Sequence, residues 1–412
     1  MLKKFITPWT AWLTFLGILL LGGLGAGILV LWKGLGITNL TDLVPWGLWI
    51  TIDLSSIALG AGAFSLCAGV YLFGLKRYQP IARTATFVGL IGYTMATLAL
   101  ILDIGKPERF WHSMVYWNTH SLLWEVTMCV ILYLTVLMLE TMPIVANWEW
   151  LRKRLPRLAS MMEGVHHYAP ILAIIGLGLS SLHQSSLGAT YGVIKARPFW
   201  FKPEMSVLFM LSAIVGGISL TLFASMLSSR LTSKAKTNDA LIERVAHFVG
   251  YLLIGYFYFR AWDALSMTYA YDPGRSEGLE LMTRGPLAFN FWIVEMFLGM
   301  IVPMTLLLYK RTRMNRFWRM IALFLVAVGV VAFRWDTNIT GFLVVMPYVS
   351  GQAIAYTSYK PSLIEIMTGA AIIAYGLTAF SLGVKYLRVV DHSLVEAEHK
   401  TVKVEATEHV TA

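Results

Sequence analysis

Charged residues are scarce in this sequence. Of its 412 residues, 14% are Asp, Glu, Lys or Arg and 57% are hydrophobic, whereas a soluble domain usually carries about a quarter charged residues. This composition excludes a water-soluble enzyme and indicates that most of the chain lies in lipid.

Cysteine is also scarce. Cys67 and Cys129 are the two cysteines, and both lie in hydrophobic stretches that we expect to be helical. Because an iron–sulfur cluster usually takes four cysteine ligands, we expect no such cluster within this chain. A packed, reduced thiol is the simpler expectation for each.

Long hydrophobic runs are abundant. A transmembrane helix needs about 20 mostly apolar residues, and the sequence predicts an all-α polytopic membrane protein with ten such helices. The expected spans lie near residues 12–32, 46–75, 84–104, 121–146, 169–191, 205–228, 246–270, 287–309, 317–333 and 362–387. The ninth is the shortest, because Arg334 and Asp336 follow it.

The first span has a rival interpretation as a signal peptide, since Lys3 and Lys4 precede it. Its apolar stretch is longer than a signal peptide's, and Gly-Ala-Gly lies inside it rather than at a cleavage boundary. We therefore expect the span to remain in the mature protein.

Positive charge is unevenly divided between the two sets of loops. With ten spans, 22 of the 33 lysines and arginines fall on the side of the two termini and ten on the opposite side. The positive-inside rule then places both termini in the cytoplasm. We interpret the net charge of +10 as this bias, and we expect lipid rather than nucleic acid as the partner of the basic loops.

A faint internal repeat is visible. Asp103-Ile-Gly-Lys ends the third span and Asp272-Pro-Gly-Arg ends the seventh, and a glutamate follows each aspartate, Glu125 after 22 residues and Glu295 after 23. The repeat predicts two four-helix bundles with the first and tenth helices peripheral. The expected units are residues 1–45 (first helix and outer loop), 46–191 (first bundle), 192–335 (second bundle), 336–387 (outer loop and tenth helix) and 388–412 (polar cytoplasmic tail).

Several ionisable residues lie inside the predicted spans, where each costs about 2.5–3.5 kcal/mol on insertion scales and needs a partner or a task. They are Asp53, Glu125, Glu140, His183, His247, Arg260, Asp263, Glu295 and Glu365. Glu140 and His247 lie near the terminal side, where we expect them to reach water. Arg260 and Asp263 can pair with each other or act catalytically. Asp53 has no basic residue within its helical turn, so it needs a cross-helix partner or a proton.

The fifth span ends in a polar run, Ser180-Ser-Leu-His183-Gln184-Ser185-Ser-Leu-Gly188. Such a run must pack against other helices or line a polar cavity, and a quinone headgroup needs donors for its two carbonyl oxygens. A haem shared by His183 and His247 is excluded, because they lie near opposite faces. One outer haem that uses His112 or His120 stays open as an alternative.

Four segments resemble the NrfD-like family of polysulfide reductase membrane subunits, and within it the HybB-like branch: residues 103–112, 118–126, 181–188 and 334–341. The similarity runs from about Pro45 to Tyr386. It implies two four-helix bundles and a haem-free, quinone-binding subunit of a respiratory complex in the cytoplasmic membrane of a bacterium or archaeon. Many family members carry Asn-Pro where this chain has Asn118-Thr119, so the geometry of that loop is the least secure part of the likeness.

The resemblance also implies partners and roles. A periplasmic ferredoxin-like iron–sulfur subunit would exchange electrons with bound menaquinone or ubiquinone. The resemblance also allows multihaem cytochrome c, molybdopterin-containing or hydrogenase subunits as further partners. We expect Asp103, Glu125 and His183 to carry the proton chemistry at the headgroup. The other expected roles are contact with the quinone (His112, Trp124, Gln184 and Ser185), proton transfer toward the cytoplasm (Asp53, Asp263 and Glu295) and partner docking (Lys106, Arg109, Trp111 and Trp117).

Three alternatives remain open from the sequence. The tryptophans are equally explained as an interfacial aromatic belt. A secondary transporter would also have duplicated bundles and buried carboxylates, but it would show helices broken at the membrane midplane. A purely structural anchor would not need Asp53 or His183.

Overall fold

A computed structural model describes residues 7–269, 271–347 and 352–392 of the chain. Ten helical segments within these residues are long and apolar enough to cross a membrane, which confirms the expected all-α architecture. They are α1 (Pro8–Lys33), α2 with α3 (Leu48–Gly60, Gly62–Tyr71), α4 (Gln79–Asp103), α6 (Leu122–Ala146), α9 (Ala169–Gly192), α10 (Met205–Leu231), α11 (Asp239–Tyr269), η6 with α13 (Asn290–Ile301, Val302–Leu308), α15 (Arg316–Leu343) and α16 (Leu363–Tyr386).

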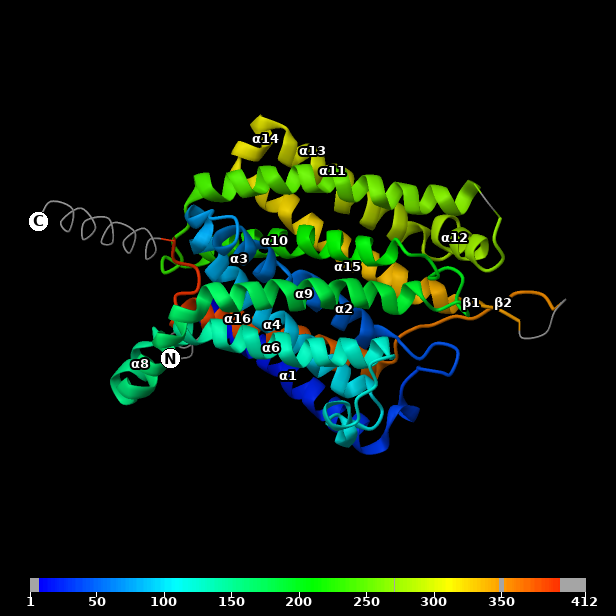
Figure 1. The fold of residues 1–412 in the computed structure, drawn as a ribbon, viewed down its shortest axis with the longest axis horizontal. Coiled ribbons are helices and arrows are strands. Elements are labelled where there is room, and N and C mark those ends of the chain that lie inside the picture. The colour runs from blue at the N-terminus through cyan, green and yellow to red at the C-terminus, as the bar shows by residue number, and fades with distance from the viewer. Residues whose placement is uncertain (1–6, 270, 348–351, 393–412) are drawn as a thin grey trace, which may run out of the picture.

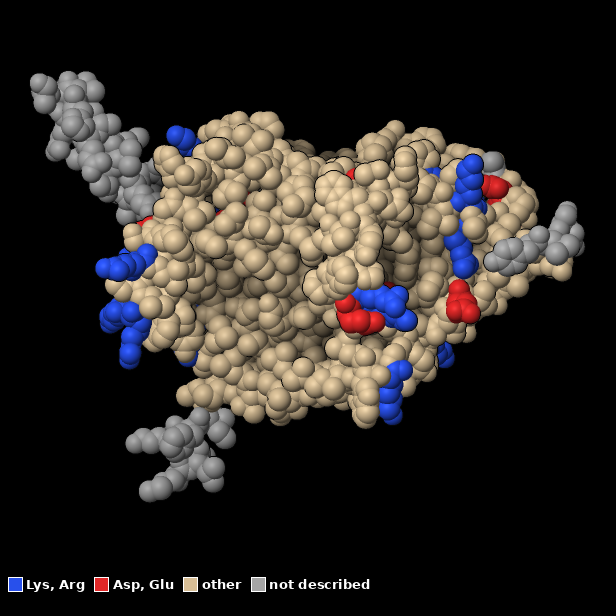
Figure 2. Space-filling view, turned by 60° about the horizontal axis from the view of Figure 1, so that its bottom comes forward, with Lys and Arg blue, Asp and Glu red and all other residues tan. Residues whose placement is uncertain are grey.

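Short elements connect these helices at the two ends of the molecule (Figure 1). The connecting helices are η2 (Leu35–Ile37), η3 (Lys76–Tyr78), η4 (Pro107–Arg109), α5 (His112–Val115), α7 (Glu149–Arg154), α8 (Pro156–Gly164), η5 (Val165–Tyr168), α12 (Arg275–Thr283) and α14 (Lys310–Met314). Strands β1 (Val344–Val345) and β2 (Ala355–Tyr356) form a small antiparallel ribbon. Charged side chains gather toward the two ends, with a broad uncharged band between them (Figure 2). This distribution suits a protein that spans a bilayer.

Two groups of helices form the body. Helices α2–α3, α4, α6 and α9 pack on one another, as do α10, α11, η6–α13 and α15. Helix α10 also packs on α2, α3 and α9, so the groups share one continuous core, and the division at residue 192 stays a prediction. Helices α1 and α16 pair outside the first group, where a Cβ on Gly23 would lie 2.1 Å from the Ala371 Cβ.

The ninth span is longer than predicted. Helix α15 continues to Leu343, so the outer loop expected from residue 334 is wrong, and Arg334 and Asp336 are buried inside the helix. Each has a contact with another helix, although Arg334 Nε and NH1 and Asp336 Oδ2 have no hydrogen-bond partner among the described residues. Arg334 lies 3.6 Å from the centre of the Phe209 ring, and Asp336 accepts a hydrogen bond of 2.7 Å from Asn290.

The start of the predicted polar tail also differs from expectation. Residues 388–392 pack on the body, with Val389 and Val390 buried. Thr84 donates to the Val389 carbonyl over 3.0 Å, and the His392 amide donates to the Lys236 carbonyl. Residues 393–412 of the predicted tail lie outside the described residues.

The second span is broken near its middle. Helix α2 ends at Gly60 and α3 begins at Gly62, where the α10 backbone comes into direct contact: a Cβ on Gly217 would lie 2.1 Å from the Gly62 nitrogen. At the break the Ala61 amide donates to the Ala58 carbonyl, whereas in a continuous α-helix it would donate to the Ile57 carbonyl. The Ile57 carbonyl is therefore available to a side chain from another helix.

We predict that Gly217→Val destabilises the protein by about 1–3 kcal/mol, because the added methyl groups must separate α10 from α3. Thermal unfolding of the detergent-purified protein measures this loss. Gly178→Val is the matched control, since a Cβ at that glycine meets no atom within 4 Å. Equal unfolding temperatures for the two variants would contradict the close contact.

Candidate functional site

His183 lies at the centre of the first helical group. Its side chain projects from α9, is fully buried, and places Nδ1 2.9 Å from the Tyr93 hydroxyl of α4. The Tyr93 ring in turn meets Tyr133 of α6 edge to face, with 4.7 Å between ring centres. His183 Nε2 is buried and has no hydrogen-bond partner among the described residues. One nitrogen is thus fixed and the other remains able to bind a ligand.

Gln184 is held by the break between α2 and α3. Its Nε2 donates over 3.2 Å to the Ile57 carbonyl, which the break releases from helical bonding. Its Oε1 is buried without a hydrogen-bond partner in the described part of the chain. The histidine and the amide therefore each present one unsatisfied polar atom inside the membrane-spanning core.

Asp53 lies one turn before Ile57 on α2 and is 3% exposed. The Arg334 guanidinium of α15 lies within electrostatic range of this carboxyl, although no ion pair within 4.0 Å is found between the two described side chains. Asp53 Oδ1, Arg334 Nε and Arg334 NH1 are buried without hydrogen bonds to described residues. Arg334 thus lies near Asp53 without pairing with it, and the cross-helix partner or proton expected for Asp53 stays a prediction.

Two more predicted carboxylates lie toward the outer end. Asp103, at the end of α4, has a buried Oδ1 without a hydrogen-bond partner among described residues and lies within electrostatic range of Asp53. Glu125, in the first turn of α6, accepts a 2.7 Å hydrogen bond from Ser186 of α9. Ser186 was not predicted, yet it follows His183 by three residues and so lies on the same helical face.

Glu365 is satisfied within the outer loops. It accepts hydrogen bonds from the Asn39 and Ser362 amides, at 3.0 and 2.7 Å, and from the Tyr359 hydroxyl at 2.5 Å. Burial, together with this bond to Glu365, raises the pKa of Tyr359. The glutamate caps α16 and is not available to a ligand.

Three residues predicted to contact the quinone lie elsewhere. The Ser185 hydroxyl donates to carbonyls of its own helix. His112 contacts Trp111 and Tyr116 edge to face in the loop between α4 and α6, and Trp124 donates to the Ser113 carbonyl over 2.8 Å. No hydrogen bond or ring contact among the described residues joins any of the three to His183.

The predicted docking residues share one exposed loop. Lys106, Arg109, Trp111 and Trp117 lie between α4 and α6, and the two tryptophans are 44% and 68% exposed. The loop therefore presents both charge and aromatic surface at the end of the molecule away from the termini.

A different arrangement fills the second group. Asp263 accepts hydrogen bonds from Lys202 and Arg260, and Arg260 also donates to Glu295 over 2.6 Å. All four side chains are buried, and burial lowers the pKa of Lys202 while Asp263 opposes that shift. Of the two roles left open for Arg260 and Asp263, the geometry favours pairing. Lys202 was missed, because nothing in the sequence places its outer loop against α11.

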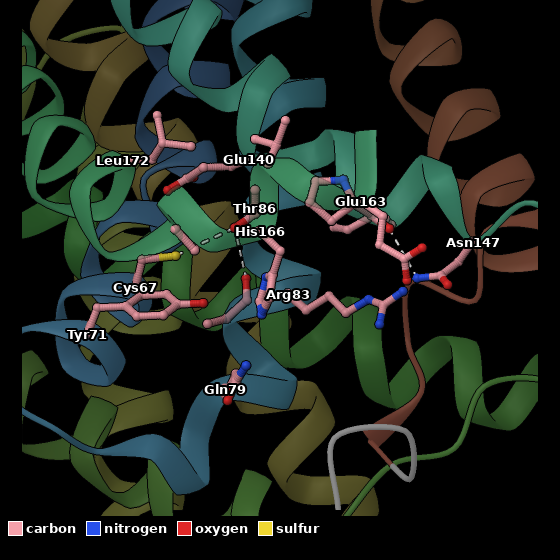
Figure 3. Close-up of a pocket in the computed structure, with 15 residues that line it drawn as sticks. Cys67, Tyr71, Gln79, Arg83, Thr86, Glu140, Asn147, Glu163, His166 and Leu172 are labelled. Carbon is pink, nitrogen blue, oxygen red and sulfur yellow. Dashed lines mark hydrogen bonds between the residues drawn. The ribbon is translucent and has the colours of Figure 1, made fainter. Parts of the chain in front are cut away.

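A cavity of about 210 Å³ opens at the terminal end of the first group (Figure 3). It lies between α3, α4, α6 and the α8–η5 segment, and Glu140, Arg83 and His166 point into it. A polar cavity of this size can hold several waters. The expectation that Glu140 reaches water is consistent with this position. Cys67 lines the same cavity, with its sulfur 3.5 Å from the Thr86 hydroxyl.

The fold and this polar core define a polytopic membrane protein whose first helical group holds unsatisfied ligand-binding atoms. The sequence model of the family described as polysulphide reductase, NrfD, matches residues 36–346. The chain belongs to this family, as its motifs predicted.

Curated relatives cover much of the chain. It is 30% identical to the menaquinone reductase integral membrane subunit of Nitratidesulfovibrio vulgaris, over 94% of this chain and 92% of that protein. It is 27% identical to a selenate reductase subunit of Mesobacillus selenatarsenatis, over 94% of this chain and 95% of that protein. The chain is also 29% identical to the probable Ni/Fe-hydrogenase 2 b-type cytochrome subunit of Escherichia coli, over 58% of this chain and 62% of that protein.

We predict that Arg260→Ala lowers the free energy of unfolding by about 3–5 kcal/mol, because it leaves two buried carboxylates without their shared partner. Denaturant titration of the purified protein measures the change. Arg109→Ala is the control, since its pair with Glu108 spans 4.0 Å and is well exposed. An Arg260 variant as stable as the control would show that the buried network contributes little.

Proposed function

We propose that this chain is the quinone-binding integral membrane subunit of a respiratory oxidoreductase. It exchanges electrons between a periplasmic iron–sulfur subunit and the menaquinone or ubiquinone pool. The observation that carries the proposal is the pair of unsatisfied atoms, His183 Nε2 and Gln184 Oε1, within a lipid-spanning helical group. The relative named as a menaquinone reductase subunit supports it.

The two atoms suit a headgroup that changes between a carbonyl and a hydroxyl form. When the Tyr93 hydroxyl donates to His183 Nδ1, the neutral imidazole carries its proton on Nε2 and can donate to a quinone carbonyl. Gln184 Oε1 can accept from a quinol hydroxyl. Because His183 and Gln184 have no exposed surface, binding requires the helices to separate, and we place that movement at the break between α2 and α3.

Reduction of a quinone takes up two electrons and two protons. We assign Asp103 and Glu125 to proton exchange at the outer end, with Asp53 beside the headgroup. Asp263 and Glu295 are bound to cations in the second group, which favours a scaffold role over the proton transfer first expected of them.

A second proton route starts from the cavity at the terminal end. Glu140 and Cys67 lie within electrostatic range of Tyr133, whose ring contacts Tyr93, and Tyr93 contacts His183. We propose that protons from the terminal side reach His183 along this series of groups. The positive-inside bias makes that side the cytoplasm, so turnover would move charge across the membrane.

The outer loop between α4 and α6 is the proposed docking surface for the iron–sulfur subunit. Lys106 and Arg109 supply charge, and Trp111 and Trp117 supply exposed aromatic area, which is the composition enriched at interfaces. Membrane-interface anchoring of the same tryptophans is the alternative. The complex would lie in the cytoplasmic membrane of a bacterium or archaeon, with both termini of this chain in the cytoplasm.

We propose that the site works without haem. One relative is named a b-type cytochrome subunit, but here His183 Nδ1 faces Tyr93, and His112 lies in the outer loop between two aromatic rings. The donor set present fits a quinone better than an iron.

His183→Ala should weaken binding of a menaquinol analogue by about 10–100-fold, because a donor to the headgroup worth roughly 1–3 kcal/mol is lost. Fluorescence quenching of the purified protein measures the dissociation constant. His247→Ala, on α11 in the second group, should bind normally. Equal affinity for the two variants would show that His183 does not bind the quinone. Uptake of a labelled solute into proteoliposomes would instead favour the secondary-transporter alternative. The broken second span is a feature that such a transporter would share.

Glu140→Gln should slow quinone reduction about tenfold or more while leaving quinone affinity unchanged, because the amide cannot release a proton to the route. Turnover with the partner subunits and analogue quenching measure the two quantities separately. Glu163→Gln is the control, since this glutamate lines the same cavity but is exposed. Normal turnover of the Glu140 variant would leave Asp103 and Glu125 as the proton donors.

A further inference from the structure

Helices α7 and α8 form a segment that stands out from the body at the terminal end of the molecule (Figure 1). This segment, called here the α7–α8 segment, consists of residues 149–164 and connects the fourth span, which ends at Ala146, to the fifth, which begins at Ala169. Each of its helices buries one residue, Leu151 in α7 and Ala159 in α8. Because a membrane-spanning helix lies on either side of it, the segment is held at the level where the bilayer meets water.

Part of the exposed surface of this segment is apolar. Leu155, Leu158 and Met161 are 47%, 39% and 66% exposed, and the last two lie three positions apart, on one face of α8. Arg157 and Ser160, also three positions apart, lie on a different face. A helix with an apolar face and a polar face lies in the plane of the membrane interface, with its apolar face among the acyl chains. In water the exposed apolar side chains would be unfavourably hydrated.

The same segment carries three cations that have no counterion among the described residues. Lys153, Arg154 and Arg157 are exposed, and no ion pair joins any of them to a described side chain. Arg152 differs, because it pairs with Glu163 over 3.2 Å. Basic clusters directly beside a membrane-spanning helix attract anionic lipid headgroups. The segment therefore presents cations at the level of the lipid phosphates.

Aromatic side chains at both ends of the segment support this depth. Trp148 and Trp150 lie at its start, with 5.0 Å between ring centres, and Tyr168 follows its end. Trp150 and Tyr168 are 52% and 58% exposed. Tryptophan and tyrosine are enriched where a membrane meets water. The apolar, basic and aromatic side chains thus fit one environment, the surface of an anionic bilayer, which the flanking spans bring to the segment without a further subunit.

We propose that the α7–α8 segment is a binding site for anionic membrane lipids. Leu158 and Met161 enter the acyl region, while Lys153, Arg154 and Arg157 bind headgroup phosphates. Arginine and lysine differ in how they hold a phosphate, because a guanidinium can donate two parallel hydrogen bonds and an ammonium acts as a point charge. The two arginines are therefore the residues whose loss should weaken headgroup binding most.

The segment also forms one wall of the cavity at the terminal end of the first helical group. Helix α8 continues into η5, and Glu163 and His166 line the cavity (Figure 3). Glu163 is bonded in turn to Arg152, at the end of α7. A lipid that holds α8 in the membrane interface therefore also holds this wall of the cavity in place.

Nitroxide labels on α8, in the whole complex reconstituted in a bilayer, test the depth of the segment. Labelled Met161→Cys should be reached mainly by oxygen, which concentrates in lipid, and labelled Ser160→Cys mainly by a water-soluble nickel chelate. We expect the ratio of oxygen to nickel accessibility to be higher at residue 161 by about threefold or more. The native Cys67 and Cys129 are buried, and labelling of the unsubstituted protein measures any reaction with them. A nickel-accessible label at residue 161, or one that neither reagent reaches because a protein covers it, would overturn the proposal.

The cations give a second measurement. In vesicles of phosphatidylglycerol and phosphatidylcholine, spin-labelled lipids report which lipid is enriched at the protein. The double variant Arg154→Gln, Arg157→Gln should lower the preference for phosphatidylglycerol by about twofold or more. Lys310→Gln, Arg311→Gln is the matched control, since both residues are exposed in the terminal-side loop between the eighth and ninth spans. Equal losses in the two double variants would show only a general attraction to the basic side and would contradict a site on α7–α8. Neither measurement involves quinone binding, so the result is independent of the proposed function.

Discussion

Water is absent from the hydrocarbon region, so each buried polar group there must find its partner in the protein or in a ligand. In the second helical group Lys202, Asp263, Arg260 and Glu295 neutralise one another, while Tyr256, Arg334 and Asp336 keep buried polar atoms without a partner among the described residues. In the first group the neighbouring residues His183 and Gln184 each keep one buried atom without a partner among the described residues. The proposal of a ligand in the first group rests on these two atoms being adjacent on one helix.

The break in the second span connects the fold to the site. An unbroken α-helix would use the Ile57 carbonyl internally, and the Gln184 amide would then lack its acceptor. Contact between Gly62 and the α10 backbone maintains the break, so helices from both groups determine the position of one ligand-binding side chain.

The ten spans could be predicted because apolar runs of membrane-spanning length are set by local composition. The polar cluster on α9 and the buried position of His183 were also visible, since a polar run within a span has few tolerable environments. The sequence did not indicate which residues on different helices contact one another. The extension of α15 past Arg334 depends on Phe209 and Ser212 of α10, more than a hundred residues earlier, and local polarity alone gave the opposite prediction.

Side-chain direction was a second limit. Ser185 and Ser186 are neighbours in an equally polar run, and only the periodicity of the helix assigns Ser186 to the face that contacts Glu125. The break between α2 and α3 was missed for a related reason. Glycine is common in transmembrane helices, so Gly60 and Gly62 alone do not predict a break. The break follows from contact with the α10 backbone, which the local sequence does not indicate.

The predicted repeat aligns a cation in one group with an aliphatic residue in the other. Arg260 precedes the Asp272 of the second copy by twelve residues, and the position twelve residues before Asp103 is Ile91. The second copy therefore has a cation for Glu295, whereas the first has an aliphatic side chain and leaves Glu125 to the weaker bond from Ser186. A hydroxyl can release a carboxylate during turnover, while a buried guanidinium holds it permanently. The lack of that arginine in the first group is consistent with the proton exchange proposed for Glu125.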